Sequence, residues 1–150
     1  MNLVAPIGRV YHAGTLSGNP ISVRAGLETV SYLYNNKETI YKELENKTKY
    51  ITENLEKLAR KYNVPVCINR LGSLYTIFFT ERDEVKNLED ALSSNTENFA
   101  TYFNTMLDNG IVIPPSQFEA HFISLALTDE DIAKTLEVAE KAFKNITNKI

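Results

Sequence analysis

Apolar residues recur at helical spacing in four stretches of the chain, and this pattern predicts four helices. The first follows a turn of small residues, Gly14–Gly18. Asn19 suits the N-cap position there, and Pro20 suits the first helical position, where its missing N–H removes no hydrogen bond. We expect this helix to continue to about Tyr34.

The second predicted helix is the longest and extends from about Lys37 to Tyr62. Lysines and glutamates occupy one face, which is typical of a solvated surface, and Glu53 and Lys57 are spaced to attract each other. The opposite face is an apolar stripe that is expected to meet the core. The stripe consists of Ile40, Leu44, Thr48, Ile51, Leu55, Leu58 and Tyr62.

Two further helices are predicted in the second half of the chain. One covers Glu97–Asn109 and is expected to stop at Gly110, which suits a left-handed C′ position. The other is capped by Thr128 and begins at Asp129, with acidic residues in its first turn, where the helix dipole favours them. The expected core faces are Phe99, Tyr102, Phe103, Met106 and Leu107 in the one and Ile132, Leu136, Ala139 and Phe143 in the other.

Short runs of β-branched and aromatic residues predict the strands. Val64–Asn69 and Ser73–Thr80 flank a turn at Leu71-Gly72 and are typical of a hairpin. Ile111–Ile113 and Phe122–Leu127 are expected to add two further strands, and the charged segment after the hairpin is expected to be a connector. This order of elements predicts an α+β fold, in which helices pack on a small, mainly antiparallel sheet.

The beginning of the chain does not resemble the start of a domain. Met1–Val10 is apolar and is expected to be extended, with Pro6 and Gly8 interrupting it. We therefore expect sequence to precede Met1 in the natural protein. On this interpretation residues 1–17 are the trailing edge of another domain, and residues 18–150 form one small domain.

Composition narrows the functional classes. The 150 residues are 43% hydrophobic and 23% charged, as in ordinary globular domains, and the net charge of −3 argues against a nucleic-acid partner. Apolar runs are far shorter than the roughly 20 residues that span a membrane, and the N-terminus has no signal-peptide pattern. The single cysteine, Cys67, fits a reducing cytoplasm, and with only the distant His12 and His121 beside it, no metal site is expected.

The turn Gly14–Pro20 is the most informative segment. Its glycines allow close approach of the backbone to a ligand, and backbone N–H groups with the hydroxyls of Thr15 and Ser17 can donate to phosphate oxygens. The following helix adds its positive N-terminal end. A plain loop capped by Asn19 is the alternative, because the segment is neither a Walker A motif nor a dinucleotide fingerprint.

The second candidate is the segment Pro114–Ala120. The double proline fixes a loop, and Glu119 lies just before an apolar run. A carboxylate there can pair with a cation or relay a proton. The alternative is a solvent-exposed loop glutamate.

Three segments resemble the glutamate-1-semialdehyde 2,1-aminomutases, a pyridoxal-phosphate family within the class III aminotransferases. They are Y-H-A-G-T-L-S-G-N-P, G-S-L-Y-T-I-F-F-T and P-P-S-Q-F-E-A-H-F-I-S-L-A-L-T-D-E-D-I. The first is shared across class III, and the other two are closer to the aminomutases. The resemblance covers the whole chain. It implies the C-terminal small domain of a fold-type I transferase, in a homodimer that isomerises glutamate-1-semialdehyde to the tetrapyrrole precursor 5-aminolevulinate.

The resemblance also implies roles for particular residues. Gly14 and Thr15 match positions that hold the phosphate of the cofactor, across the dimer interface in the neighbouring subunit's site. Glu119 matches a carboxylate near the active site that helps to organise the substrate and the gating of the site. Lesser roles are implied for the turn residues Ser17, Gly18 and Asn19 and for Ser116 and Gln117.

The chain departs from the family pattern in four places. His12 replaces the common glutamine, Leu74-Tyr75 the usual methionine-phenylalanine, His121 a frequent glycine, and Leu127 a common histidine. We interpret His121 as an interface or loop residue rather than a catalytic one.

The family's reactive lysine, which carries the cofactor as a Schiff base, lies before the segment resembled here. The resemblance therefore implies that this chain alone is inactive and does not bind pyridoxal phosphate. Two alternatives remain open. The chain can belong to another class III aminotransferase, or it can be a freestanding module that dimerises or binds a partner without catalysis.

Overall fold

The structure, a computed structural model, describes residues 1–148 and divides into two compact units, Met1–Lys37 and the part from Glu38 onward. The domain boundary predicted at residues 17 and 18 lies inside the first unit. It concerns a larger protein and stays a prediction.

The first unit contains helix α1, Pro20–Asn35, as predicted. Asn19 is its N-cap, and the side-chain oxygen of Asn19 accepts hydrogen bonds from the N–H groups of Ile21 and Ser22, both at 3.1 Å. The apolar residues of α1 are not buried against any described part of the chain. The apolar spacing, the cap and the proline thus predict this helix correctly, although none of its residues is buried.

The prediction of an extended segment at Met1–Val10 is wrong. The chain folds back on itself in turns, and a single parallel bridge joins Val4 to Val10. The N–H of Gly8 donates to the carbonyl of Val4 at 2.9 Å, and a Cβ on Gly8 would lie 2.1 Å from a backbone atom of Leu3. The glycine therefore permits a tight loop where apolar composition alone indicated a strand.

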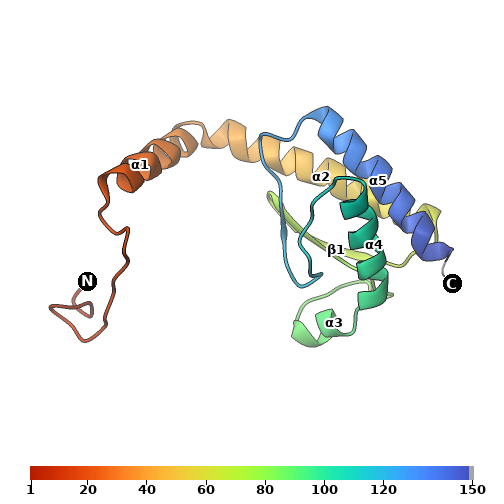
Figure 1. Cartoon of the computed structure of the whole chain (residues 1–150), viewed down its shortest axis with the longest axis horizontal. Coiled ribbons are helices and arrows are strands. Elements are labelled where there is room, and N and C mark those ends of the chain that lie inside the picture. Colours follow the sequence, from red (N-terminus) through yellow and green to blue (C-terminus); the bar gives the residue numbers. More distant parts are fainter. Residues whose placement is uncertain (149–150) are drawn as a thin grey trace. The chain divides into compact units, whose positions relative to one another are not determined.

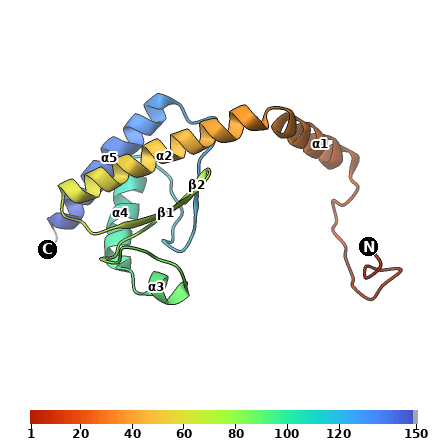
Figure 2. The same ribbon diagram turned by 180° about the vertical axis from the view of Figure 1, so that it is seen from behind.

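The second unit combines helices with a small sheet (Figures 1 and 2). Helices α2 and α4 and the terminal helix agree with the prediction to within about two residues, which is the usual uncertainty of helix ends. The elements are α2 (Lys37–Lys61), β1 (Cys67–Leu71), β2 (Leu74–Phe78), α3 (Leu88–Leu92), α4 (Thr96–Asp108), β3 (His121–Phe122) and α5 (Asp129–Thr147).

The sheet is antiparallel, with β2 between β1 and β3, so the predicted α+β class is confirmed. The hairpin is also confirmed, and Gly72 supplies its turn with a φ of +56°. β1 begins three residues later than predicted. The N–H of Val64 closes the end of α2 by donating to Ala59, and Pro65 has no N–H to offer a neighbouring strand.

The two later strand predictions are largely wrong, for a reason that lies outside each segment. Of the predicted strand Phe122–Leu127, only Phe122 lies in a strand, β3. The N–H of Ile123 still donates to the carbonyl of Ser73. Ser73 lies in the hairpin turn, so the residues after Ile123 have no strand to pair with. The predicted strand Ile111–Ile113 is absent. Its first N–H donates to Met106 and completes the end of α4 instead.

Helix α3 was not predicted and lies at the end of the expected connector. Asn87 caps it by accepting from the N–H of Asp90 at 2.9 Å. Arg82 pairs with Asp90 at 3.1 Å, which ties the start of the connector to the helix. Its five residues carry too little apolar periodicity to be detected from sequence.

The predicted i, i+4 pair between Glu53 and Lys57 does not form. Glu53 instead pairs with Lys49, one turn earlier, at a distance of 3.7 Å. Both side chains are more than half exposed, so this exchange has little effect on stability.

The core lies between one face of the hairpin and helices α2, α4 and α5 (Figures 1 and 2). Tyr75, Ile77 and Phe79 point into it, as expected for alternate residues of β2 and its extension. The ring of Phe79 contacts three aromatic rings from α4 and α5 at centroid distances of 5.5 to 6.4 Å. On the opposite face Cys67 and Phe78 form a smaller cluster with Val85.

We predict that Phe143→Ala lowers the free energy of unfolding by about 3–5 kcal/mol, because Phe143 is fully buried against Phe79 and Tyr102. Urea unfolding followed by circular dichroism measures this change. Phe143→Leu keeps most of the volume and should lose about 1.5 kcal/mol or less. The control Phe122→Ala, at a side chain that is 76% exposed, should change stability by less than about 0.5 kcal/mol.

His121 is the first residue of β3, so the loop part of our interpretation is wrong, while its place at an interface stays a prediction. It pairs with Tyr75 across the sheet, and the two rings stack at a centroid distance of 4.4 Å and an interplanar angle of 16°. The ring is buried, and burial lowers the pKa of His121 to about 4. His121 is therefore a neutral, sheet-forming residue at physiological pH.

This burial makes stability depend on pH. The folded pKa of His121 lies below the unfolded value of about 6.5, so its contribution is complete above pH 6.5 and is lost as pH falls toward 4. We predict that His121→Phe, which keeps the stacking on Tyr75, removes roughly 2 kcal/mol of the loss in stability between pH 7 and pH 5. Urea unfolding at both pH values tests this.

The matched control for this experiment is His12→Phe, because His12 is exposed and its replacement should leave the pH dependence intact. An unchanged pH dependence in His121→Phe would contradict the prediction.

Candidate functional site

The turn before α1 is built by hydrogen bonds within the small-residue segment. The N–H of Ser17 donates to the carbonyl of Gly14 at 2.9 Å, and the N–H of Asn19 donates to the carbonyl of Leu16 at 3.0 Å. Gly18 has a φ of +77°, which a side chain would strain. Two successive turns therefore form here, and the glycines in the sequence match their geometry.

The outer surface of this turn fits a phosphate. Gly14 and Thr15 are exposed, and within residues 1–148 neither the N–H nor the hydroxyl of Thr15 has a hydrogen-bond partner. A Cβ on Gly14 would lie 2.8 Å from the hydroxyl oxygen of Ser17, so glycine keeps this hydroxyl accessible. Free donors and a missing side chain are the features that a phosphate site requires.

The N-terminus of α1 contributes less than the sequence indicated. Asn19 already occupies the N–H groups of Ile21 and Ser22, and Pro20 has none. The donors available to an anion are therefore those of the turn itself.

The second predicted segment is held in place by its backbone. The N–H of Glu119 donates to the carbonyl of Ser116 at 3.1 Å, and the carbonyl of Glu119 accepts from the hydroxyl of Thr76 on β2 at 3.3 Å. The side chain of Glu119 is exposed, and its carboxylate has no partner among residues 1–148. The sheet thus fixes the backbone and leaves the carboxylate available.

Gln117, in the same segment, is buried, whereas Glu119 is exposed. Its side chain is only 2% exposed, and its amide nitrogen and oxygen have no protein partner within the described residues. Both ring nitrogens of His121 are also buried without a partner. Buried polar atoms of this kind are normally satisfied by water or by another molecule. The sequence placed Gln117 near the site but did not predict its burial.

The contacts of Lys47, on α2, were not predicted from the sequence. Its ammonium group reaches the carbonyls of Leu125 and Leu127, in the segment that follows β3. The available signal was its position, three residues after Leu44 and four before Ile51, which places it at the edge of the apolar stripe rather than on the solvated face.

Gly14 and Thr15 lie in the first unit and Glu119 lies in the second. Within residues 1–148 no group of three or more histidine, cysteine, aspartate or glutamate side chains could hold a metal ion. The described helices include none that is long and apolar enough to cross a membrane.

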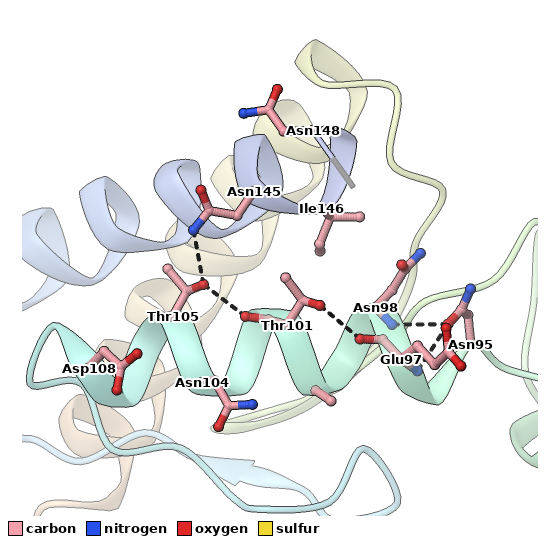
Figure 3. Close-up of a pocket in the computed structure, with 11 residues that line it drawn as sticks. Asn95, Glu97, Asn98, Thr101, Asn104, Thr105, Asp108, Asn145, Ile146 and Asn148 are labelled. Carbon is pink, nitrogen blue, oxygen red and sulfur yellow. Dashed lines mark hydrogen bonds between the residues drawn. The ribbon is translucent and has the colours of Figure 1, made fainter. Parts of the chain in front are cut away.

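A pocket of about 870 Å³ lies between α4 and α5, and none of the predicted site residues lines it (Figure 3). Its lining is rich in amide and hydroxyl side chains, and some of these bond within the protein. The amide of Asn145 donates to the hydroxyl of Thr105 at 3.2 Å, and that hydroxyl donates to the carbonyl of Thr101 at 2.8 Å (Figure 3). These contacts join the two helices, so we assign this pocket a structural role.

Residues 1–143 match the family described as aminotransferase class-III. A protein from Fusobacterium nucleatum named glutamate-1-semialdehyde 2,1-aminomutase is 66% identical over 149 residues, which is 99% of this chain and 34% of that protein. One of the same name from Natranaerobius thermophilus is 49% identical over 142 residues, or 95% of this chain and 32% of that protein.

The chain spans about a third of the length of the curated relatives it matches. Solved structures agree in fold. An omega-transaminase from Sphaerobacter thermophilus superimposes with a TM-score of 0.72 at 18% identity, covering 91% of this chain and 30% of that one. A structure described as a transaminase with PLP bound gives 0.71 at 17% identity, covering 97% and 32%. The predicted relation to the fold of pyridoxal-phosphate transferases is confirmed. This chain belongs to the class III aminotransferase family.

Proposed function

We propose that this chain is part of a glutamate-1-semialdehyde 2,1-aminomutase, which converts glutamate-1-semialdehyde into its isomer 5-aminolevulinate. The observation that carries the proposal is the 66% identity, over nearly the whole chain, to a protein of that name. The open turn at Gly14 and Thr15 and the available carboxylate of Glu119 are compatible with it.

In this proposal Gly14 and Thr15 bind the phosphate of pyridoxal 5'-phosphate. Thr15 donates from its N–H and its hydroxyl, both of which lack partners in the described chain, and Gly14 leaves the approach unobstructed. When bound, the cofactor supplies an electron sink for chemistry next to an amino group. The turn itself binds and orients, and performs no chemical step.

Glu119 has a separate role. An exposed carboxylate on a backbone fixed by Thr76 can attract the amino group of a substrate and exclude poses that bring a carboxylate close. We infer that Glu119 orients glutamate-1-semialdehyde and takes part in gating the site. In this proposal another part of the enzyme completes the surroundings of the exposed carboxylate.

The lysine that carries the cofactor is proposed to lie in the part of the relatives that this chain does not span. The chain alone is therefore expected to be inactive and to leave the cofactor unbound. We further propose that the complete protein is a cytoplasmic homodimer in which the turn at Gly14 serves the site of the neighbouring subunit.

A second function is favoured by one specific observation. The family that residues 1–143 match is described as aminotransferase class-III, so transfer of an amino group between two substrates, as in an omega-transaminase, is the alternative chemistry for the same turn. A freestanding binding module is a third interpretation, in which the turn would only cap α1.

We predict that the Fusobacterium nucleatum protein, with its matching third replaced by this chain, forms 5-aminolevulinate from glutamate-1-semialdehyde. The reason is that the replaced third is 66% identical and supplies the same turn and carboxylate. Product formation is measured by colorimetric assay of 5-aminolevulinate, with the unaltered protein as control. This chain alone should form none.

Two results would count against this proposal. Amino transfer to an external oxo-acid without isomerisation by the hybrid protein would favour the omega-transaminase alternative. A folded hybrid that performs neither reaction would favour a non-catalytic module.

We also predict that Thr15→Val in the hybrid protein weakens pyridoxal phosphate binding roughly 10- to 100-fold, since one hydrogen bond to a charged oxygen is removed. Fluorescence titration of the cofactor-free protein measures this. Thr29→Val is the matched control, because the hydroxyl of Thr29 donates to the carbonyl of Ala25 inside α1, at 2.9 Å. Equal affinity in the two variants would remove Thr15 from the phosphate site.

A further inference from the structure

The segment between β3 and α5 lacks regular secondary structure, and its backbone needs other partners. Ser124 makes a local turn in which its hydroxyl accepts from the N–H of Ala126 at 3.1 Å. The carbonyls of Leu125 and Leu127 have no partner within this turn. Both are then satisfied by a single side chain from another element.

That side chain is Lys47 of α2. Its nitrogen lies 3.0 Å from the carbonyl oxygen of Leu127, 3.3 Å from that of Leu125 and 3.0 Å from the carboxylate of Glu43. An ammonium group has three N–H donors, so these three acceptors match its full capacity. The side chain of Lys47 is only 18% exposed, which makes these bonds stronger than those of a surface lysine.

The neighbouring Lys49 shows what an ordinary lysine of the same helix does. It is 56% exposed, and its one ion pair, to Glu53, measures 3.7 Å. Such a pair contributes little to stability. Lys47 therefore differs from Lys49 in being more buried and in having more partners. One of these partners, Leu127, is 80 residues away in the sequence.

The segment that Lys47 holds is the one that carries Glu119. The backbone of Glu119 is fixed at one end by Thr76, and β3 follows two residues later. Lys47 fixes the other end, after β3. Because β3 pairs through only two residues, the sheet alone gives this segment little support.

We propose that Lys47 is a positioning residue, which holds residues 119–127 in the conformation that presents the Glu119 carboxylate to the substrate. The effect of Lys47 on substrate binding rests on the proposed function of Glu119. The claim that Lys47 holds residues 119–127 in place does not. Lys47 acts through the backbone and makes no contact with substrate. Its loss should affect substrate binding, while the phosphate turn at Gly14 and Thr15 keeps its cofactor affinity.

The first experiment compares Lys47→Met with Lys49→Met in this chain by hydrogen–deuterium exchange. Methionine keeps the apolar stem of lysine and removes the three donors. We expect amides of residues 119–127 to exchange roughly tenfold faster in Lys47→Met and to be unchanged in Lys49→Met, because local opening becomes easier. Equal exchange in the two variants would overturn the proposal, whatever the enzyme does.

The second experiment uses the hybrid protein and a double-mutant cycle. Lys47→Met should raise KM for glutamate-1-semialdehyde roughly tenfold or more, with cofactor affinity unchanged. Added to Glu119→Gln, it should have little further effect, because both changes remove the same oriented carboxylate. Lys49→Met should leave KM unchanged in either background.

The outcomes separate the two claims. An inactive hybrid with intact Lys47 would count against the proposed function, and the exchange experiment would still decide whether Lys47 holds the segment. An active hybrid in which the effects of Lys47→Met and Glu119→Gln are additive would overturn the positioning role, since a merely structural lysine acts independently of Glu119.

Discussion

The burial of alternate β2 side chains against three helices is the constraint on which the second unit depends. Tyr75, Ile77 and Phe79 point to the same side, and α2, α4 and α5 can only cover that side if their apolar stripes face it. A shift of one residue in register would expose all three side chains. The same register sets His121 against Tyr75 and brings the segment of Glu119 to the edge of the sheet. The position of the proposed site residue is therefore a consequence of the core.

The starts of the helices could be predicted because they depend on nearby residues. Asn19 and Thr128 cap their helices as expected, since a cap depends only on residues within one turn. The strand at Phe122–Leu127 could not be predicted correctly, because a strand needs a partner and the hairpin ends before it could supply one beyond Ile123. The strand at Ile111–Ile113 does not form because its first N–H completes the end of α4. Lys47 was missed for a related reason, since the carbonyls it binds lie far away in the chain.

The two parts of the candidate site also differ in how far the sequence alone predicts them. Residue types made the turn Gly14–Pro20 a candidate, with a plain capped loop as the alternative, and the roles of Gly14 and Thr15 came from the resemblance. The open donors of Thr15 are compatible with those roles. The assignment of the turn to one cofactor nevertheless depends on the relatives, because an open turn fits any phosphate. Glu119 is the reverse case. Its backbone is bound by Thr76, whereas its exposed carboxylate has no partner among residues 1–148, so its role stays a proposal.

Two of the departures from the family pattern lie opposite one another in the sheet. Tyr75 stands where phenylalanine is usual and His121 where glycine is frequent, and these residues pair across β2 and β3 with stacked rings. A glycine at position 121 would leave the ring at position 75 uncovered, so the histidine replaces missing contact area. A third departure is Leu127, whose backbone carbonyl accepts a hydrogen bond from Lys47. Any residue at this position can supply that carbonyl. The chain thus changes side chains along this segment while its backbone supports, at Thr76 and Lys47, do not depend on them.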